Sequence, residues 1–248
     1  MATPTPGVHI RPNGEKVFIP LENNPQLFAS LVHRLGVSKK LSFHDVYSIS
    51  DPDLLAFVPR PAHALIFISP GDVYHRVHGR DEAREITYDG KGDNENVVWF
   101  KQTIGNACGL IALLHAVCNG SAREFIEEGS LVDRLLKQAL PLGVEERAKV
   151  LYDSKELEEA HMAFATQGDS AAPAAEDEPG LHFLAFVAGR DGHLYELEGG
   201  FNGPVDLGEM AEGEDCLSEK ALQMGVGRFV EKAEGTVEMS VIALCEGE

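Results

Sequence analysis

Apolar residues follow two different spacings along the chain. From Asn24 to Gly36 they recur three and four positions apart, which predicts a helix with Asn24 as its N-cap and Gly36 as its stop. Short apolar runs at 41–48 and 63–70 are typical of strands. The run at 16–21 contains a proline and predicts a strand at a sheet edge. The first part of the chain therefore combines helix with strand.

The long apolar run at 107–118 predicts a helix that is apolar around most of its circumference, and such a helix is buried. Asn106 is the expected N-cap of this helix. Further periodic stretches predict helices at 131–140, 144–164 and 217–233, a hairpin at 182–200 and a final strand at 236–244. No internal repeat is visible. Helices mixed with hairpins predict a single α+β or mixed α/β domain.

Two segments contain few residues that could be buried. Residues 1–15 are rich in Pro, Thr and Gly and predict a flexible lead-in to a domain that spans 16–248. Residues 165–180 predict a mobile loop of unusual length. Long loops inside compact domains often cover functional sites, so this loop is a candidate lid.

Composition narrows the class of protein. The chain has 248 residues, 44% of them hydrophobic, which is enough for one large buried core. No run approaches the ~18–20 apolar residues that cross a membrane, and no signal-like N-terminus is visible, so we expect a soluble cytoplasmic protein, with the nucleus left open. The net charge of −19 argues against nucleic acid or an anionic membrane as partner and favours a basic one.

The cysteines bear on the redox state and on cofactors. Four occur in the chain, at Cys108, Cys118, Cys216 and Cys245. They show neither the C-x-x-C spacing of a metal or redox site nor the density of a disulfide scaffold. We therefore expect reduced thiols, no metal and no cofactor.

Cys108 falls in the first turn of the predicted buried helix. Unpaired backbone N–H groups and the positive end of the helix dipole favour the thiolate there, and the thiolate is the nucleophilic form. Gln102 lies six residues upstream, where its amide could donate to the oxyanion of a tetrahedral intermediate alongside the Cys108 N–H. A cysteine in an apolar run is otherwise a small buried hydrophobe, and spacing alone leaves that alternative open.

A histidine and an acid complete this candidate site. His182 opens an apolar strand directly after the long loop. If residues 189–191 form a three-residue hairpin turn, the register puts His182 directly opposite Glu198 on the same face. Directly opposed Cβ atoms lie about 4.5–5.5 Å apart, which suits a carboxylate that orients an imidazole. Cysteine, histidine and acid then form a plausible triad.

These residues stand within motifs that resemble the ubiquitin C-terminal hydrolases, papain-like cysteine peptidases of the deubiquitinase class. The motifs run in family order over about residues 16–246 and cover essentially the whole chain. They are PLENNP (20–25), FHDVYSI (43–49), VPRPAHAL (58–65), FKQTIGNACGLIALLHAVCNG (100–120), LHFLAFV (181–187), GHLYELEG (192–199) and the LSEKAL helix with the closing strand.

The resemblance implies a central antiparallel sheet flanked by helices, with a knotted chain path. It implies that residues 165–180 form a crossover loop over the active site. Carried over by motif, Cys108 matches the nucleophile, Gln102 the oxyanion-hole glutamine and His182 the general base and acid.

The acid departs from the family pattern. Where the family motif reads LYELDG, this chain reads LYELEG, so Glu198 replaces an aspartate. The preceding turn, AGRDGH, is also one residue longer than the resemblance leads us to expect. An extra turn residue can be absorbed without flipping the strand, which leaves Glu198 on the His182 face, whereas a one-residue slip would point it away.

The implied function is a thiol hydrolase that cleaves the bond after the C-terminal glycine of ubiquitin and releases small or unfolded adducts. Glu22 and Asp45, near the PLE and DVY motifs, are implied ubiquitin contacts, with solvated surface acids as the alternative. Two other functions stay open, namely hydrolysis of a neddylation-type modifier and a non-catalytic ubiquitin-binding module. We expect the protein to act as a monomer.

Overall fold

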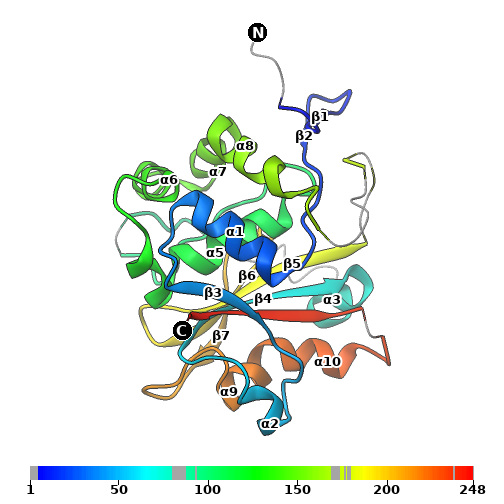
Figure 1. Ribbon diagram of the computed structural model, residues 1–248, viewed down its shortest axis with the longest axis vertical. Helices are drawn as coiled ribbons and strands as arrows, with labels where there is room; N and C mark the ends of the chain where they lie inside the picture. Colours follow the sequence, from blue (N-terminus) through cyan, green and yellow to red (C-terminus); the bar gives the residue numbers. More distant parts are fainter. Residues whose placement is uncertain are drawn as a thin grey trace.

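A six-stranded antiparallel sheet forms the centre of the molecule. The computed structural model describes residues 5–79, 88–92, 94–168, 174–175, 177, 180–236 and 238–247. Neighbouring strands follow the order β3-β8-β4-β5-β6-β7. These strands are β3 (Leu41–Asp45), β4 (Ala62–Pro70), β5 (Leu181–Ala188), β6 (His193–Leu197), β7 (Val205–Glu209) and β8 (Ser240–Glu246). Helices lie on both faces of the sheet (Figure 1), which confirms the predicted fold class.

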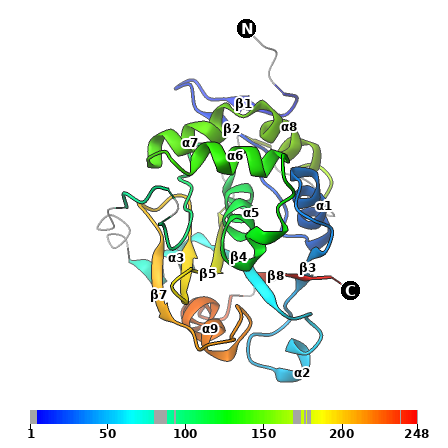
Figure 2. The ribbon, with the colours of Figure 1, turned by 90° about the vertical axis from the view of Figure 1, so that its left-hand side faces the viewer.

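The larger core lies between one face of the sheet and five helices. They are α1 (Pro25–Leu35), α5 (Cys108–Cys118), α6 (Leu131–Ala139), α7 (Val144–Asp153) and α8 (Lys155–Phe164). Helix α5 packs on β4 and β5, and ten of its eleven residues are buried. Figures 1 and 2 show α5 between the sheet and the outer helices. The predicted central burial of this helix is confirmed.

A second core lies on the opposite face of the sheet. It is covered by α9 (Glu219–Leu222), a π-helical turn (Gln223–Gly227) and α10 (Arg228–Lys232), which follow one another without a break. Helix α3 (Gly71–His78) follows β4 directly and packs against α10 and against β4 and β5. This short helix brings its side chains close to β5.

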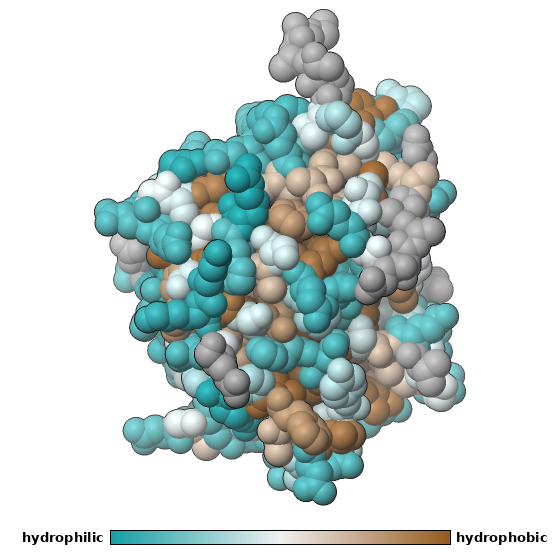
Figure 3. All heavy atoms as spheres, viewed as in Figure 1, coloured by the Kyte–Doolittle hydropathy of each residue, from teal (hydrophilic) through white to brown (hydrophobic). Residues whose placement is uncertain are grey.

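Peripheral elements complete the chain. Strands β1 (His9–Ile10) and β2 (Lys16–Val17) form a separate small sheet, and a 3₁₀ helix (Gly120–Phe125) follows α5. Helix α2 (Pro52–Leu55) lies at the lower tip of the molecule, where Figure 3 shows hydrophobic residues gathered on an otherwise mostly hydrophilic face. Phe57, just after α2, is 77% exposed.

Local sequence signals explain the helix ends. The Asn24 side chain accepts from the backbone N–H groups of Gln26 and Leu27, and Gly36 adopts a φ of 97°, so both predicted ends of α1 are confirmed. The predicted helix at 144–164 is instead two helices. Ser154 leaves the helical conformation between them and caps α8 by accepting from the Leu157 N–H.

Several short elements differ from the sequence prediction. The strand predicted at 16–21 is confined to Lys16–Val17, and the strand predicted from 236 begins only at Ser240. Strand β1 lies inside the segment predicted as a flexible lead-in. Strand β7 and helix α3 were not predicted, because each is short and carries few of the apolar positions that a periodicity argument needs.

The β5–β6 hairpin turns one residue later than predicted. Gly192, with a φ of 81°, takes the left-handed position that ends a three-residue turn, so the turn comprises 190–192 instead of 189–191. The Gly189 N–H donates to the His193 carbonyl oxygen at 2.8 Å and closes the turn. Ala185 consequently lies opposite Leu197. The direct opposition of His182 and Glu198 was therefore wrong, although an even shift of register keeps both on one face.

Candidate active site

Cys108 is the first residue of α5. The residue before the helix is Ala107, with a φ of −92°, so the prediction that Asn106 is the N-cap was wrong. Asn106 has a φ of 57°, and its side-chain amide donates to the carbonyl oxygens of Ala175 and Asp177, both at 3.0 Å. It therefore ties the described part of the predicted crossover loop to the start of the cysteine helix.

The Cys108 sulfur lies among backbone donors. The backbone N–H groups of Phe183, Gly109 and Cys108 itself lower the pKa of the thiol and so favour the thiolate. Because Phe183 directly follows His182, this interaction puts the sulfur beside the histidine strand. Cys108 keeps part of its surface exposed.

Burial works against these donors. It raises the pKa of the Cys108 thiol, the charge of Glu198 raises it further, and the pKa stays above its ordinary value of 9.0 despite the N–H groups. The thiolate preference expected from the helix terminus is thus outweighed in the unbound protein. Cys118 lies at the other end of α5, is 1% exposed, and has a pKa raised by burial to about 12.

His182 is the second residue of β5 and lies opposite Ser69 of β4. Burial lowers its pKa, and the nearby His75 lowers it further. The imidazole is therefore neutral near pH 7, as a general base must be. The ring of Tyr74 packs against it with 5.2 Å between ring centroids.

Glu198 directly follows β6 and is 4% exposed. Its carboxylate accepts from the Tyr74 hydroxyl at 3.4 Å and from the backbone N–H of Gly200. Burial, with a smaller contribution from Glu196, raises the pKa of Glu198 to about 7. Among the described residues, no hydrogen bond joins Glu198 to His182; both side chains instead contact Tyr74.

Gln102 lies in the extended segment that leads into α5. Its backbone N–H donates to the carbonyl oxygen of Gly199 at 2.8 Å, which links it to the chain beside Glu198. Its side-chain amide donates to the Ile104 carbonyl oxygen at 3.0 Å. An amide nitrogen carries two hydrogens, so one remains for an oxyanion.

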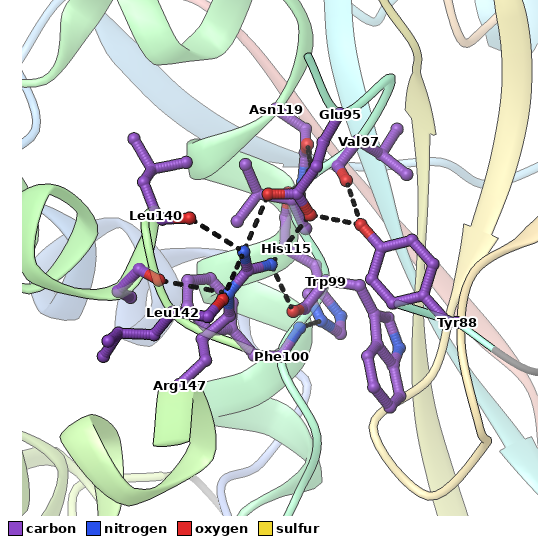
Figure 4. A network of polar contacts seen from close by, with 12 residues as sticks. Tyr88, Glu95, Val97, Trp99, Phe100, His115, Asn119, Leu140, Leu142 and Arg147 are labelled. Atoms are coloured by element: carbon purple, nitrogen blue, oxygen red, sulfur yellow. Dashed lines mark hydrogen bonds and ion pairs between the residues drawn. The ribbon is translucent and has the colours of Figure 1, made fainter. Parts of the chain in front are cut away.

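A buried ion pair anchors the segment before Gln102 (Figure 4). Arg147 is fully buried and binds Glu95 through two contacts, at 2.7 and 2.9 Å. The Tyr88 hydroxyl donates to the same carboxylate, and an Arg147 N–H donates to the Trp99 carbonyl oxygen at 3.1 Å. These contacts fix the backbone three residues before Gln102.

His115 of α5 and Asn119, the residue after this helix, also hold the segment before Gln102 (Figure 4). Asn119, just after the helix, accepts from the Val98 N–H at 2.6 Å and donates to the Val98 carbonyl oxygen at 2.9 Å. His115 accepts from the Phe100 N–H at 2.9 Å, and burial lowers its pKa to about 3. His115 is therefore a neutral structural residue that positions the approach to Gln102.

The two predicted ubiquitin contacts approach the start of β8. Glu22 lies in a pocket of about 520 Å³ whose other lining residues include Leu181, the neighbour of His182, and Glu238. Asp45 ends β3 opposite Ile242 of β8. Glu22 therefore lies close to the catalytic candidates. Asp45 lies on β3, at the edge of the six-stranded sheet.

Sequence reasoning missed Tyr74, which contacts both His182 and Glu198. Its stretch carries no motif, so no local signal could have identified it. Across the described ranges, no cluster of His, Cys, Asp and Glu is arranged to hold a metal ion. Within the same ranges, no helix has the length and apolar character that a membrane span requires.

The sequence is similar to proteins of a known family along most of its length. The family model for ubiquitin carboxyl-terminal hydrolase, family 1, matches residues 18–231. Ubiquitin carboxyl-terminal hydrolase isozyme L1 of Equus caballus is 35% identical over 227 residues, which cover 92% of this chain and 97% of the relative. Isozyme L1 of Homo sapiens is 34% identical over the same shares of both chains. The chain therefore belongs to ubiquitin carboxyl-terminal hydrolase family 1, and it is a cysteine-type hydrolase.

Solved structures share the fold. The Trichinella spiralis UCH37 catalytic domain bound to ubiquitin vinyl methyl ester matches with a TM-score of 0.70 and 20% identity, over 93% of this chain and 95% of that chain. A second UCH37 structure, also bound to ubiquitin vinyl methyl ester, matches with a TM-score of 0.68 and 20% identity, over 92% and 82% of the two chains. Both likenesses extend over nearly all of this chain.

Proposed function

We propose that this protein cleaves the bond after the C-terminal glycine of ubiquitin, with Cys108 as the nucleophile. His182 acts as general base and acid, Gln102 supplies an oxyanion-hole donor, and Glu198 is the acid that supports His182. The observation that carries the proposal is the packing of α5, which begins at Cys108, against β5, the strand that contains His182, in a chain of this family.

The chemistry follows the thiol-hydrolase scheme. Neutral His182 takes the thiol proton as the sulfur attacks the glycine carbonyl carbon. The carbonyl oxygen becomes an oxyanion, which Gln102 and the Cys108 backbone N–H stabilise. Collapse of this intermediate breaks the bond to the leaving group, which receives the proton from His182. Water then hydrolyses the thioester, and His182 takes a proton from that water.

The raised pKa of the Cys108 thiol affects the proton transfer in the first step. A thiol that is mostly protonated in the unbound protein needs the base at the moment of attack, so His182 contributes to the rate at neutral pH.

Ubiquitin as substrate is supported by charge. Glu22 and Glu238 line the pocket beside Leu181, and the chain carries a net charge of −19. Acidic side chains here would favour the basic C-terminal tail of ubiquitin. The ubiquitin vinyl methyl ester bound in the two solved structures of the same fold agrees with this choice. Monomeric action in the cytoplasm stays a prediction from the sequence.

A thiol-reactive ubiquitin probe tests the nucleophile. Cys108→Ala should abolish both labelling and turnover of a fluorogenic ubiquitin conjugate, while ubiquitin binding persists. Cys118→Ala is the matched control, because this second cysteine of α5 is buried at the far end of the helix. An inactive Cys118→Ala at unchanged stability, or an active Cys108→Ala, would contradict the assignment.

A second measurement addresses the substrate. We expect the parent protein to turn over the ubiquitin conjugate at a higher kcat/KM than the matching conjugate of the neddylation modifier. The reverse order would make the modifier the substrate. Ubiquitin binding without labelling or turnover would show that the protein is a non-catalytic ubiquitin-binding module.

A further inference from the structure

Tyr74 lies between the two residues expected to work together in proton transfer. It is 7% exposed and projects from α3 into the core on the sheet face opposite α5. Its ring centroid is 5.2 Å from that of His182, with 31° between the ring planes, and its hydroxyl is 3.4 Å from Glu198 Oε2. Figure 1 shows α3 beside α10 at one end of the sheet.

Neighbouring polar side chains pair with Glu196 and not with the Glu198 carboxylate. Glu196, two residues earlier and on the same face of β6, is fully buried. His78 Nε2 lies 2.8 Å from Glu196 Oε1, and Arg228 of α10 pairs with its other oxygen. These two side chains pair with Glu196, so among the described residues the Tyr74 hydroxyl and the Gly200 N–H are the groups that donate to the Glu198 carboxylate.

We propose that Tyr74 is a positioning residue for hydrolysis: its hydroxyl holds the Glu198 carboxylate while its ring fixes the plane of the His182 imidazole. The inference rests on the proposed function and goes beyond the nucleophile, base, acid and oxyanion donor. The acid then supports the base through a shared aromatic neighbour, which fits a glutamate that makes no direct bond to the histidine among the described residues.

Several charged or titratable groups surround this pair. The pKa of Glu198 is affected by Tyr74 and His78 of α3 and by Glu196 of β6. Arg228 of α10 pairs with Glu196. His75 of α3 lowers the pKa of His182, and the charge of Glu198 raises the pKa of Cys108 on α5.

The direction of the Tyr74 effect follows from these groups. Burial, together with the charges of Glu198 and Glu196, raises the pKa of Tyr74 far above its ordinary value, so its hydroxyl stays a donor throughout the working range. The hydrogen bond from Tyr74 lowers the pKa of Glu198, against the larger effect of burial. Loss of the hydroxyl should therefore keep Glu198 protonated to higher pH.

Tyr74→Phe removes the hydroxyl and keeps the ring. With a fluorogenic ubiquitin conjugate, we expect kcat to fall about tenfold, a fraction of the ~10²–10⁴ that general acid–base catalysis contributes, with KM unchanged. We also expect the acidic limb of the pH–rate profile to move to higher pH. Tyr195→Phe is the matched control, because Tyr195 is also a buried tyrosine that donates to a carboxylate, Asp191, at 2.7 Å. Its profile should match that of the parent.

A double-mutant cycle separates positioning from a general structural effect. If the hydroxyl acts through Glu198, adding Tyr74→Phe to Glu198→Gln should change kcat less than twofold. Independent, multiplicative losses in the double variant would overturn the proposal. So would a Tyr74→Phe profile that superimposes on that of the parent.

A readout without ubiquitin keeps this test distinct from the proposed function. Cys118, Cys216 and Cys245 are buried, so iodoacetamide should alkylate Cys108 selectively in the folded protein. We expect the pH dependence of alkylation to shift in Tyr74→Phe and to stay unchanged in Tyr195→Phe. If the parent protein does not turn over ubiquitin conjugates but Tyr74→Phe still shifts the pH dependence of alkylation, the proposed substrate is contradicted and the role of Tyr74 remains intact. Identical alkylation profiles for all three proteins would overturn the role of Tyr74.

Discussion

Gln102 and Gly199 are in direct contact: the backbone N–H of Gln102 donates to the Gly199 carbonyl oxygen at 2.8 Å. A Cβ at position 199 would lie 2.8 Å from Gln102 Cβ and 2.9 Å from Ile111 Cγ2, closer than real Cβ contacts come. Only glycine fits here without a shift. The contact fixes the distance between the proposed oxyanion donor and the chain that carries Glu198.

Gly199→Ala should therefore displace Gln102. Because misplacement by about 1 Å can cost ~10²-fold in rate, we expect kcat on a ubiquitin conjugate to fall roughly 10- to 100-fold. The free energy of unfolding, measured by denaturant titration, should fall by about 1–3 kcal/mol. Gly143→Ala serves as the control, since its Cβ would meet only the Glu146 carboxylate, at 3.0 Å. Full activity of Gly199→Ala would show that the contact does not position Gln102.

The acid can be tested by graded substitution. We expect Glu198→Asp to keep more activity than Glu198→Ala, and His182→Ala to be the least active, because the carboxylate supports the imidazole whereas the histidine carries the proton. Steady-state kcat/KM values on one fluorogenic conjugate give the order. Equal rates for Glu198→Ala and the parent would mean that another group supports His182.

The raised pKa of Glu198 also predicts a pH-dependent effect on stability. Between its ordinary value of 4.5 and about 7, the folded protein holds a proton at Glu198 that the unfolded chain has released. The contribution of this group to stability is thus present below pH 4.5 and is lost as pH rises through 7. Glu198→Gln should raise Tm relative to the parent by more at pH 8 than at pH 5. Glu209→Gln, on the exposed side of β7, should show no such difference.

The buried pair Arg147 and Glu95 should be sensitive to removal of one partner. Arg147→Met leaves the buried Glu95 carboxylate without its cationic partner, so we expect a loss of about 3–5 kcal/mol in the free energy of unfolding. The double variant Arg147→Met/Glu95→Gln removes both charges and should lose less. Chemical denaturation of the two variants checks this order, and a double variant less stable than Arg147→Met would refute it.

The loop predicted at 165–180 supplies a test of leaving-group size. Residues 169–173, 176 and 178–179 lie outside the described part of the chain, while α8 and β5 anchor the two ends. A tethered span should pass an extended ubiquitin tail with a small adduct and hinder a folded leaving group. A Gly/Ser insertion of about ten residues after Ala172 gives the span more reach, and it should raise cleavage of isopeptide-linked diubiquitin. Efficient diubiquitin cleavage by the parent, or no gain on insertion, would exclude the loop as the size filter.

Sequence reasoning reached the features that depend on nearby residues. The ends of α1 followed from Asn24 and Gly36, whose effects act within one helical turn. Burial of α5 followed from its own apolar run, and this put Cys108 in the first turn. The family followed from motifs spread over most of the chain, and the family model and the relatives confirm it.

Tertiary structure decided how the candidate residues meet. The sequence suggested a direct pair of His182 and Glu198, but the turn that closes at Gly192 set another register, because a left-handed backbone position is easiest for glycine. Tyr74 and Glu198 are 124 positions apart, and no local pattern records their contact. The Cys108 thiol shows the same limit: the helix terminus was visible in the sequence, but the burial that outweighs its effect on the pKa arises only in the folded protein. Local sequence signals therefore determined the longer elements such as α1 and α5, whereas long-range packing determined the partners and the protonation of the site.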